Sequence, residues 1–175
     1  MNAQLAFLKT AVQELDMQTH LPSAPGKSDY KKAILATPLS RVEEYLTQQL
    51  QSSIYADSVP IKSSLKDKLA WALQANIDEQ MQNWFIRQGE KRPNAETFGF
   101  SLLDDNNGTR QIQVTGYQWH ALNEKAKKGK KSGFSSVDLT GKLQITDLSG
   151  FEQALFNGIG RAKAFGCGLL MIRKT

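Results

Sequence analysis

The chain has 175 residues, with 22 lysines and arginines against 17 aspartates and glutamates, and a single cysteine. This length suffices for one domain of good size or for two small ones, with a core that needs no covalent staple. One cysteine excludes a disulfide framework, and no charged-then-apolar leader or apolar run of about 18 residues occurs, so we expect a cytoplasmic protein without a membrane span.

The positive charge is concentrated in the C-terminal part of the chain. Residues 110–175 carry 11 Lys/Arg against 4 Asp/Glu, or +7, whereas residues 1–109 carry 11 against 13, or −2. A surface that faces an anionic partner is therefore expected in the C-terminal half.

The first 52 residues show helical periodicity. Apolar residues at helical spacing predict an amphipathic helix over about residues 2–15, namely Leu5, Leu8, Val12 and Leu15. A second helix is expected after Thr37-Pro38, a pair typical of helix starts, with an apolar face of Leu39, Val42, Leu46 and Leu50. The turn-rich string SAPGKSDYKK between them predicts a surface loop.

From residue 53 the pattern shifts towards strands. Ile54 to Ile61 predict an edge strand or a strand end, because Pro60 cannot donate to a ladder. A helix is expected over residues 77–88, with Gly89 as its stop. Residues 98–102 and 112–114 alternate on either side of a DNNG turn, which predicts a hairpin.

The remaining periodic segments complete a recognisable order. Residues 137–145 predict a half-buried strand, residues 151–156 a short helix, and Leu169 to Ile172 a central, fully buried strand. Strand, helix, strands, helix and strand is the order of an α+β, ferredoxin-like (RRM-like) domain with an antiparallel sheet, here over residues 53–175. Residues 1–52 are too few for a second such unit, so we expect an abbreviated, largely helical N-terminal region.

A run of lysines lies between two of the predicted strands. Five of the seven residues from 125 to 131 are lysine: Lys125, Lys127, Lys128, Lys130 and Lys131. Taken alone, such a run is more often a solvated loop than a binding element. Its position in the positively charged half, between strands of one sheet, favours contact with a polyanion.

The C-terminal run FEQALFNGIGRAKAFGCGLLMIR combines glycines with two cations, Arg161 and Lys163. The glycines are Gly158, Gly160, Gly166 and Gly168. Glycine has no Cβ, so a phosphate backbone could lie directly on this loop. The dinucleotide pattern GxGxxG fails because Lys163 stands at its third glycine, and the Walker pattern lacks its Gly-Lys-Ser/Thr end. The loop also follows a helix and precedes a strand, the reverse of the order that nucleotide pockets need.

This loop resembles the glycine-rich signature of the RAMP superfamily of CRISPR proteins. The longer string SSVDLTGKLQITDLSGFEQALFNGIGRAKAFGCGLLMIR resembles the end of the CasE family, the CRISPR RNA-processing endoribonuclease of the type I-E Cascade complex. The resemblance is strong over residues 135–173 and looser over about 57–134, through VPIKSS, QMQNWFIRQGEK and FGF. The N-terminus departs from the family, which opens with a β-strand and a helix carrying Tyr-x-x-His, whereas this chain opens MNAQLAFLKTAVQELDMQTH.

The resemblance implies a protein that binds the repeat stem-loop of the precursor CRISPR RNA, cleaves it without metal or cofactor, and keeps the product together with other Cascade subunits. The RNA 2′-hydroxyl attacks the scissile phosphate and leaves a cyclic phosphate and a free 5′-hydroxyl, which requires a general base and a general acid. His20 is the first candidate, because it lies near the position of the family's histidine. His120, next to Trp119 at a predicted strand end, is the second, with a purely structural histidine as its alternative. Two distant histidines and Cys167 supply no metal-ligand cluster.

Two other functions stay open at this point. One is a hairpin-binding subunit of the same ancestry that does not cleave, and the other is a ferredoxin-like protein-interaction domain with no RNA role. The lysine run and the glycine-rich loop disfavour the second. The evidence for binding lies in the C-terminal half that resembles the family, and the evidence for cleavage lies in the N-terminal half that does not.

Overall fold

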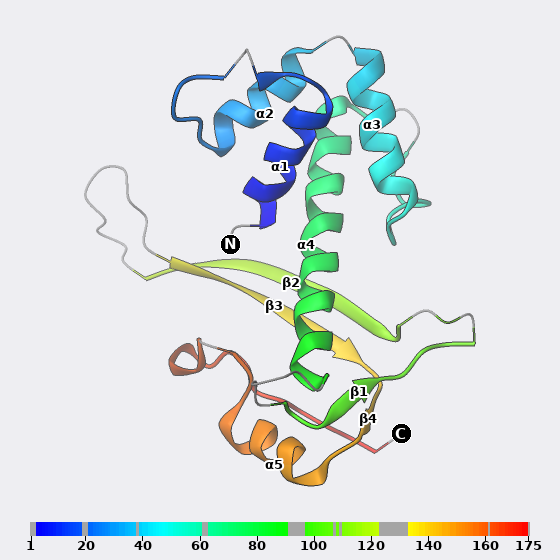
Figure 1. The fold of residues 1–175 in the computed structure, drawn as a ribbon, viewed down its shortest axis with the longest axis vertical. Coiled ribbons are helices and arrows are strands. Elements are labelled where there is room, and N and C mark those ends of the chain that lie inside the picture. The colour runs from blue at the N-terminus through cyan, green and yellow to red at the C-terminus, as the bar shows by residue number, and fades with distance from the viewer. Residues whose placement is uncertain are drawn as a thin grey trace. The chain divides into compact units, whose positions relative to one another are not determined.

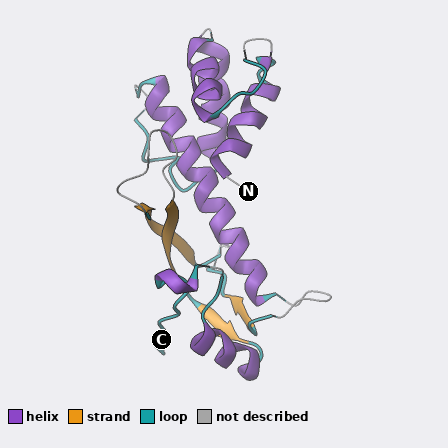
Figure 2. Cartoon of the chain, turned by 90° about the vertical axis from the view of Figure 1, so that its left-hand side faces the viewer, coloured by secondary structure: helices purple, strands orange, loops and turns teal. Residues whose placement is uncertain are grey.

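The computed structural model describes residues 3–18, 21–37, 39–60, 63–90, 97–106, 108, 110–122, 133–160 and 162–174. Contacts divide the chain into two compact units, Met1–Gln80 and Met81–Thr175. The regular structure described in the first unit is helical, and the four described strands all belong to the second (Figures 1 and 2). The predicted α+β class, with a helical N-terminal region before antiparallel strands, is confirmed. The sequence prediction places the boundary between the two regions after residue 52, whereas the contacts place it after Gln80, inside a helix.

The first unit is built from α1 (Ala3–Glu14), α2 (Lys27–Ala36), α3 (Leu39–Gln51) and the beginning of α4 (Leu65–Gly89) (Figure 1). Of the apolar faces predicted for the helices now seen as α1 and α3, Leu5 is partly buried and the side chain of Leu39 lies outside the description. The other six residues are buried, namely Leu8, Val12, Leu15, Val42, Leu46 and Leu50. None of the described helices is long and apolar enough to cross a membrane.

The loop predicted for SAPGKSDYKK is wrong over its second half, where α2 begins at Lys27. The carboxylate of Asp29 accepts the Gly26 N–H at 2.9 Å, which satisfies a donor at the helix start. Tyr30 and Ile34 lie four residues apart and are both buried. The turn residues Pro25 and Gly26 therefore lie directly before a helix that has an apolar face, and they do not indicate a loop over the residues that follow.

The strand predicted over residues 54–61 is also wrong, because the described residues there form successive turns. The Ala56 N–H donates to Ser53 and the Ser58 N–H to Tyr55, at 3.2 and 3.0 Å. Bonds between residues three apart coil the backbone and leave no extended edge to pair. Ile54, the first residue of the predicted strand, is 62% exposed.

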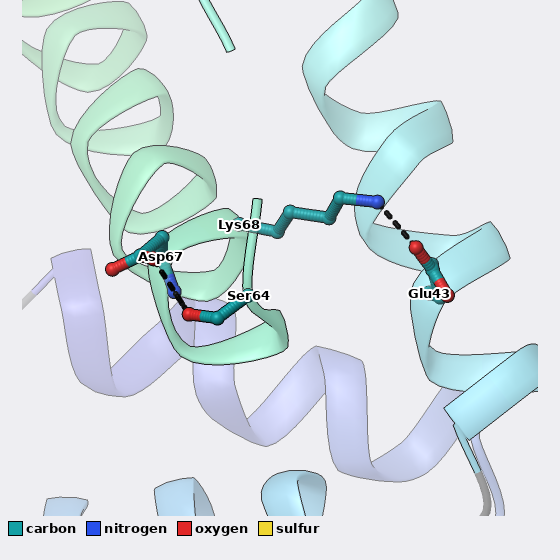
Figure 3. A network of polar contacts seen from close by, with 4 residues as sticks. All are labelled: Glu43, Ser64, Asp67 and Lys68. Carbon is teal, nitrogen blue, oxygen red and sulfur yellow. Dashed lines mark hydrogen bonds and ion pairs between the residues drawn. The ribbon is translucent and has the colours of Figure 1, made fainter. Parts of the chain in front are cut away.

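The helix predicted over residues 77–88 begins twelve residues earlier, as α4 (Leu65–Gly89). The Ser64 hydroxyl accepts the Asp67 N–H at 3.2 Å, which caps the helix (Figure 3). Lys68 is 7% exposed and pairs with Glu43 of α3, so its charge is compensated within the first unit (Figure 3). Leu69, Leu73 and Ile77 belong to the buried apolar face of this helix. Lysines near the helix start interrupt the apolar pattern in the sequence, which is why the predicted helix began too late.

The strands of the second unit pair differently from the sequence prediction. They are β1 (Phe100–Leu102), β2 (Ile112–Ala121), β3 (Gly133–Gly141) and β4 (Leu143–Ile145), in the antiparallel pairs β1–β4 and β2–β3. The predicted hairpin between residues 98–102 and 112–114 survives only as one bridge between Asp104 and Arg110. The alternation of apolar and polar residues predicted that these segments form strands, but it does not determine which strands pair.

A bulge interrupts the ladder between β2 and β3. Thr115 pairs with Asp138 and Gln118 with Ser136, so Gly116 and Tyr117 together face one residue of β3. Gly116 has a φ of 62°, a conformation that favours glycine. Beyond the bulge the pairing continues regularly to Ala121 and Gly133.

The predicted short helix is confirmed as α5 (Leu148–Asn157), and the Asp147 carboxylate caps it by accepting the N–H groups of Ser149 and Gly150. The core of this unit consists of Phe100, Phe151, Ala154 and Ile159. A short 3₁₀ turn, η2 (Lys163–Phe165), follows α5.

The buried strand predicted for Leu169 to Ile172 is wrong. The backbone of residues 169–174 makes no hydrogen bond with described residues and is drawn in red without an arrow (Figure 1). Leu169 is 73% and Met171 90% exposed, and only Leu170 packs against the core. The apolar composition predicted burial, but the segment pairs with none of the described strands and leaves most of its apolar side chains exposed.

A buried carboxylate links two parts of the first unit. Asp78 is 3% exposed and accepts hydrogen bonds from the Tyr55 hydroxyl at 2.5 Å and from Gln74 Nε2 at 2.8 Å. Burial of the phenol, and next its hydrogen bond to Asp78, raise the pKa of Tyr55 from 10.0 to about 12. Burial and the nearby Glu14 likewise raise the pKa of Tyr45 to about 12.

These two pKa values predict how stability depends on alkaline pH. The unfolded chain releases the phenol protons near pH 10, whereas the folded chain keeps them to about pH 12. The free energy of unfolding should therefore fall between about pH 10 and 12. Urea unfolding followed by circular dichroism over this range should show a shallower fall for Tyr55→Phe than for the wild type. Tyr117→Phe, on an exposed part of β2, is the control and should keep the wild-type slope; an unchanged slope in Tyr55→Phe would contradict the assignment.

Candidate functional site

The glycine-rich loop is closed at its neck by a backbone hydrogen bond. Gly158 ends α5 with a φ of 69°, and the next residue, Ile159, donates its N–H to the Gly168 carbonyl at 2.9 Å. A Cβ on Gly168 would lie 2.1 Å from the Ile159 carbonyl oxygen, and a Cβ on Gly158 would lie 2.9 Å from the Gly168 carbonyl oxygen. These two glycines allow the sides of the neck to touch, which is a structural role.

Gly160 and Gly166 differ from the neck glycines in their surroundings. Their φ values are 99° and 78°, so both adopt conformations that favour glycine. A Cβ on Gly166 would meet nothing within 4 Å, and one on Gly160 would reach only the Trp84 ring at 3.5 Å. Lys163 is exposed between them. Gly166 therefore leaves backbone open to another molecule, whereas Gly160 is partly buried next to the Trp84 ring; Arg161 lies outside the described residues.

His120 lies on β2, directly opposite Phe134 of β3, and is partly buried. Its Nε2 is 2.7 Å from the Ser136 hydroxyl oxygen. Its imidazole stacks on the Phe134 ring with centroids 4.8 Å apart and planes inclined by 22°. The histidine is therefore held by one hydrogen bond and one ring face.

A second stacking contact joins the hairpin to the glycine-rich loop. The Phe134 ring stacks on Phe165 of η2, with centroids 4.9 Å apart and planes inclined by 28°. Three rings from three separate segments thus form one stack, and we call His120, Phe134 and Phe165 the ring stack. It brings the second-choice histidine of the sequence prediction next to the loop that carries Lys163 and Gly166.

The first-choice histidine, His20, lies outside the described residues, as do the five lysines from Lys125 to Lys131. The position of the five lysines in the sequence is nevertheless informative. The paired strands β2 and β3 end at Ala121 and Gly133, so the lysine run connects two neighbouring strands, as the sequence predicted. Two aromatic side chains near this end of β2 are exposed, Tyr117 by 44% and Trp119 by 50%. Exposed aromatic side chains are typical of surfaces that bind single-stranded nucleic acid.

Sequence reasoning missed Phe134, Ser136 and Phe165. It weighed the glycines and cations of the loop and assigned no role to Phe134 or Phe165. One signal was available, because Phe165 is the only aromatic residue between Gly158 and Gly168. An aromatic side chain in a glycine-rich, basic loop has little core to fill and therefore indicates an exposed contact.

The site offers three chemical groups. His120 presents an imidazole, Lys163 supplies a positive charge, and Gly166 allows close approach to the backbone. Within the described residues there is no group of three or more His, Cys, Asp or Glu side chains that could hold a metal ion. This combination suits a phosphodiester ligand.

Most of the chain is similar to one family of known proteins. A family model described as CRISPR associated protein matches residues 33–174. No curated protein and no solved structure matches the chain significantly.

The two kinds of glycine should respond differently to substitution. Gly166→Ala bears only the strain of a left-handed backbone and should lower the free energy of unfolding by about 1 kcal/mol. Gly168→Ala adds a clash with a backbone oxygen and should break the neck, so we expect a decrease of about 3 kcal/mol or more. Urea unfolding of both variants measures the difference. Equal decreases would mean that the Ile159–Gly168 contact does not hold the loop.

Proposed function

Since the chain belongs to the CRISPR associated protein family, we propose that it processes CRISPR RNA in the cytoplasm. It binds the repeat stem-loop of the precursor transcript and cleaves it by attack of an RNA 2′-hydroxyl. It then retains the product within a complex of the Cascade type, with the other subunits as partners.

The observation that carries this proposal is the ring stack. Through two stacking contacts, the partly buried His120 is joined to a loop with an exposed lysine, Lys163, and a glycine that leaves backbone open, Gly166. The loop and the histidine therefore belong to one packed cluster of the second unit. The excess charge of +7 over residues 110–175 supports an anionic ligand on this unit.

The reaction follows from the chemistry of RNA. The 2′-oxygen forms a bond to the adjacent phosphorus while the bond from phosphorus to the 5′-oxygen breaks. The products are a 2′,3′-cyclic phosphate and a free 5′-hydroxyl. A base takes the 2′-hydroxyl proton and an acid protonates the leaving 5′-oxygen, and an imidazole can perform either step near neutral pH. We assign one of these two proton transfers to His20, and His120 is the second candidate for the same role.

A specific observation favours a second candidate function. His120 Nε2 is engaged with Ser136, and one face of its ring is covered by Phe134. A histidine held in this way has a structural reason to be there. If His20 also takes no part in proton transfer, the protein is a hairpin-binding subunit that does not cleave.

The lysine run is expected to contact the phosphates of the RNA stem. Replacing all five lysines of the run by Ala should flatten the dependence of log K on log salt by about 0.7 to 0.9 for each phosphate that is no longer neutralised. Filter binding of the labelled repeat hairpin at several salt concentrations measures this slope. A matched control removes five cations of the first unit, namely Lys9, Lys31, Lys32, Arg41 and Lys66. An unchanged slope in the first variant would remove the run from the interface.

Cleavage should depend on a histidine and not on a metal. His20→Ala should slow cleavage of the repeat RNA by about 10²–10⁴-fold while its affinity stays nearly unchanged. Wild-type cleavage should persist in EDTA, because the attacking oxygen belongs to the RNA and no metal-bound water is required. Denaturing gels of end-labelled RNA measure the rate.

The controls separate the possible outcomes. RNA with 2′-deoxyribose at the scissile nucleotide should bind but remain intact. Cleavage that stops on chelation would overturn the mechanism. Cleavage that persists in His20→Ala and vanishes in His120→Ala would move the assignment to His120. Tight hairpin binding by the wild type without any cleavage would select the non-cleaving subunit.

A further inference from the structure

The ring stack is open at one end. His120 occupies one end and is partly buried, and Phe134 lies between two rings. Phe165 occupies the other end, with one face against Phe134 and 54% of its surface exposed. An aromatic ring with one face packed and most of its remaining surface exposed to water can stack with another planar group.

Phe165 is also held in place before any ligand arrives. Its own N–H donates to the Ala162 carbonyl at 3.0 Å, and the Gly166 N–H donates to Lys163 at 3.0 Å, which closes the turn around it. The neck bond between Ile159 and Gly168 fixes both ends of the loop. Because the ring is already ordered, stacking on it would cost little conformational entropy.

The surroundings of Phe165 indicate what the flat group is. Lys163 lies two residues before it and is exposed, and Gly166 directly after it has open space at its Cβ position. A purely apolar partner would gain nothing from this cation, whereas a nucleotide pairs a flat base with a negative phosphate. The chemistry of the patch therefore fits a nucleotide better than an apolar protein segment.

We propose that Phe165 stacks an unpaired nucleobase of the bound RNA, next to the base-paired stem, while Lys163 meets the phosphate of that nucleotide. This inference rests on the proposed function, because it takes the repeat hairpin as the ligand. Stacking reads the flat face of the base and not its edge, so the site accepts any base and prefers the larger purines. The stacking site would lie where the base-paired stem of the RNA meets its unpaired strand.

The test uses the repeat hairpin with a few unpaired nucleotides on each side of the stem. These carry 2′-deoxyribose to prevent attack, and EDTA is present throughout. Kd is measured for this RNA and for the same RNA with abasic nucleotides at the unpaired positions. For the wild type, removal of the bases should weaken binding by about 5- to 150-fold, the usual range for one stacked base.

The ratio of the two Kd values is then measured in variants, since a ratio within one protein is insensitive to partial unfolding. Phe165→Ala should bring the ratio close to one, and Phe165→Trp should restore the wild-type ratio. Phe156→Ala removes a phenylalanine of the same unit that is 88% exposed, and should behave like the wild type. In parallel, 2-aminopurine at the unpaired positions should be quenched by the wild type and not by Phe165→Ala.

Each other outcome overturns the inference. A wild-type ratio near one, with tight hairpin binding, removes the stacking site and leaves the proposed function intact. A wild-type ratio that persists in Phe165→Ala places the base elsewhere, and its disappearance in Trp119→Ala would assign it to β2. No hairpin binding by the wild type overturns the proposed function and this inference together.

Discussion

The second unit depends on the packing of one side chain, Phe100. Its ring is 1% exposed and lies 5.0 Å from Phe85 of α4 and 6.3 Å from Phe151 of α5, measured between ring centroids. Its backbone pairs with Ile145 of β4, the strand that leads into α5. One residue thus joins two helices to a sheet. The glycine-rich loop begins where α5 ends, so the geometry of the loop is set by a core residue that has no part in its chemistry.

Local patterns allowed the helices of the first unit to be predicted, because the burial of Val12 or Leu46 follows from residues within two turns of the same helix. The errors arose where a distant partner decides the structure. A strand was predicted at residues 54–61 and another at 169–172, since residue types typical of strands were present, but neither segment pairs with a strand among the described residues. The partner of β1 lies more than forty residues away in the sequence.

The candidate site shows the same division. The glycines, Lys163 and His120 could be named from the sequence, because each carries its chemistry in its residue type. The ring stack could not, because its members come from β2, β3 and η2 and meet only in the folded chain. The glycines also proved to be of two kinds. Gly158 and Gly168 hold the neck, whereas a Cβ on Gly160 or Gly166 would meet no backbone atom within 4 Å, a distinction that depends on which atoms would face an added Cβ.

The bulge at Gly116 decides which side chain of β2 reaches the ring stack. If the extra residue were absorbed into a regular ladder, β2 would slide by one position beyond Thr115, Trp119 would stand opposite Phe134, and His120 would turn to the other face. A bulky residue at position 116 favours that slide, because it resists a φ of 62°. Deletion of Gly116 removes the extra residue and leaves every later pair unchanged. At this position the removal of a residue is a milder change than its replacement.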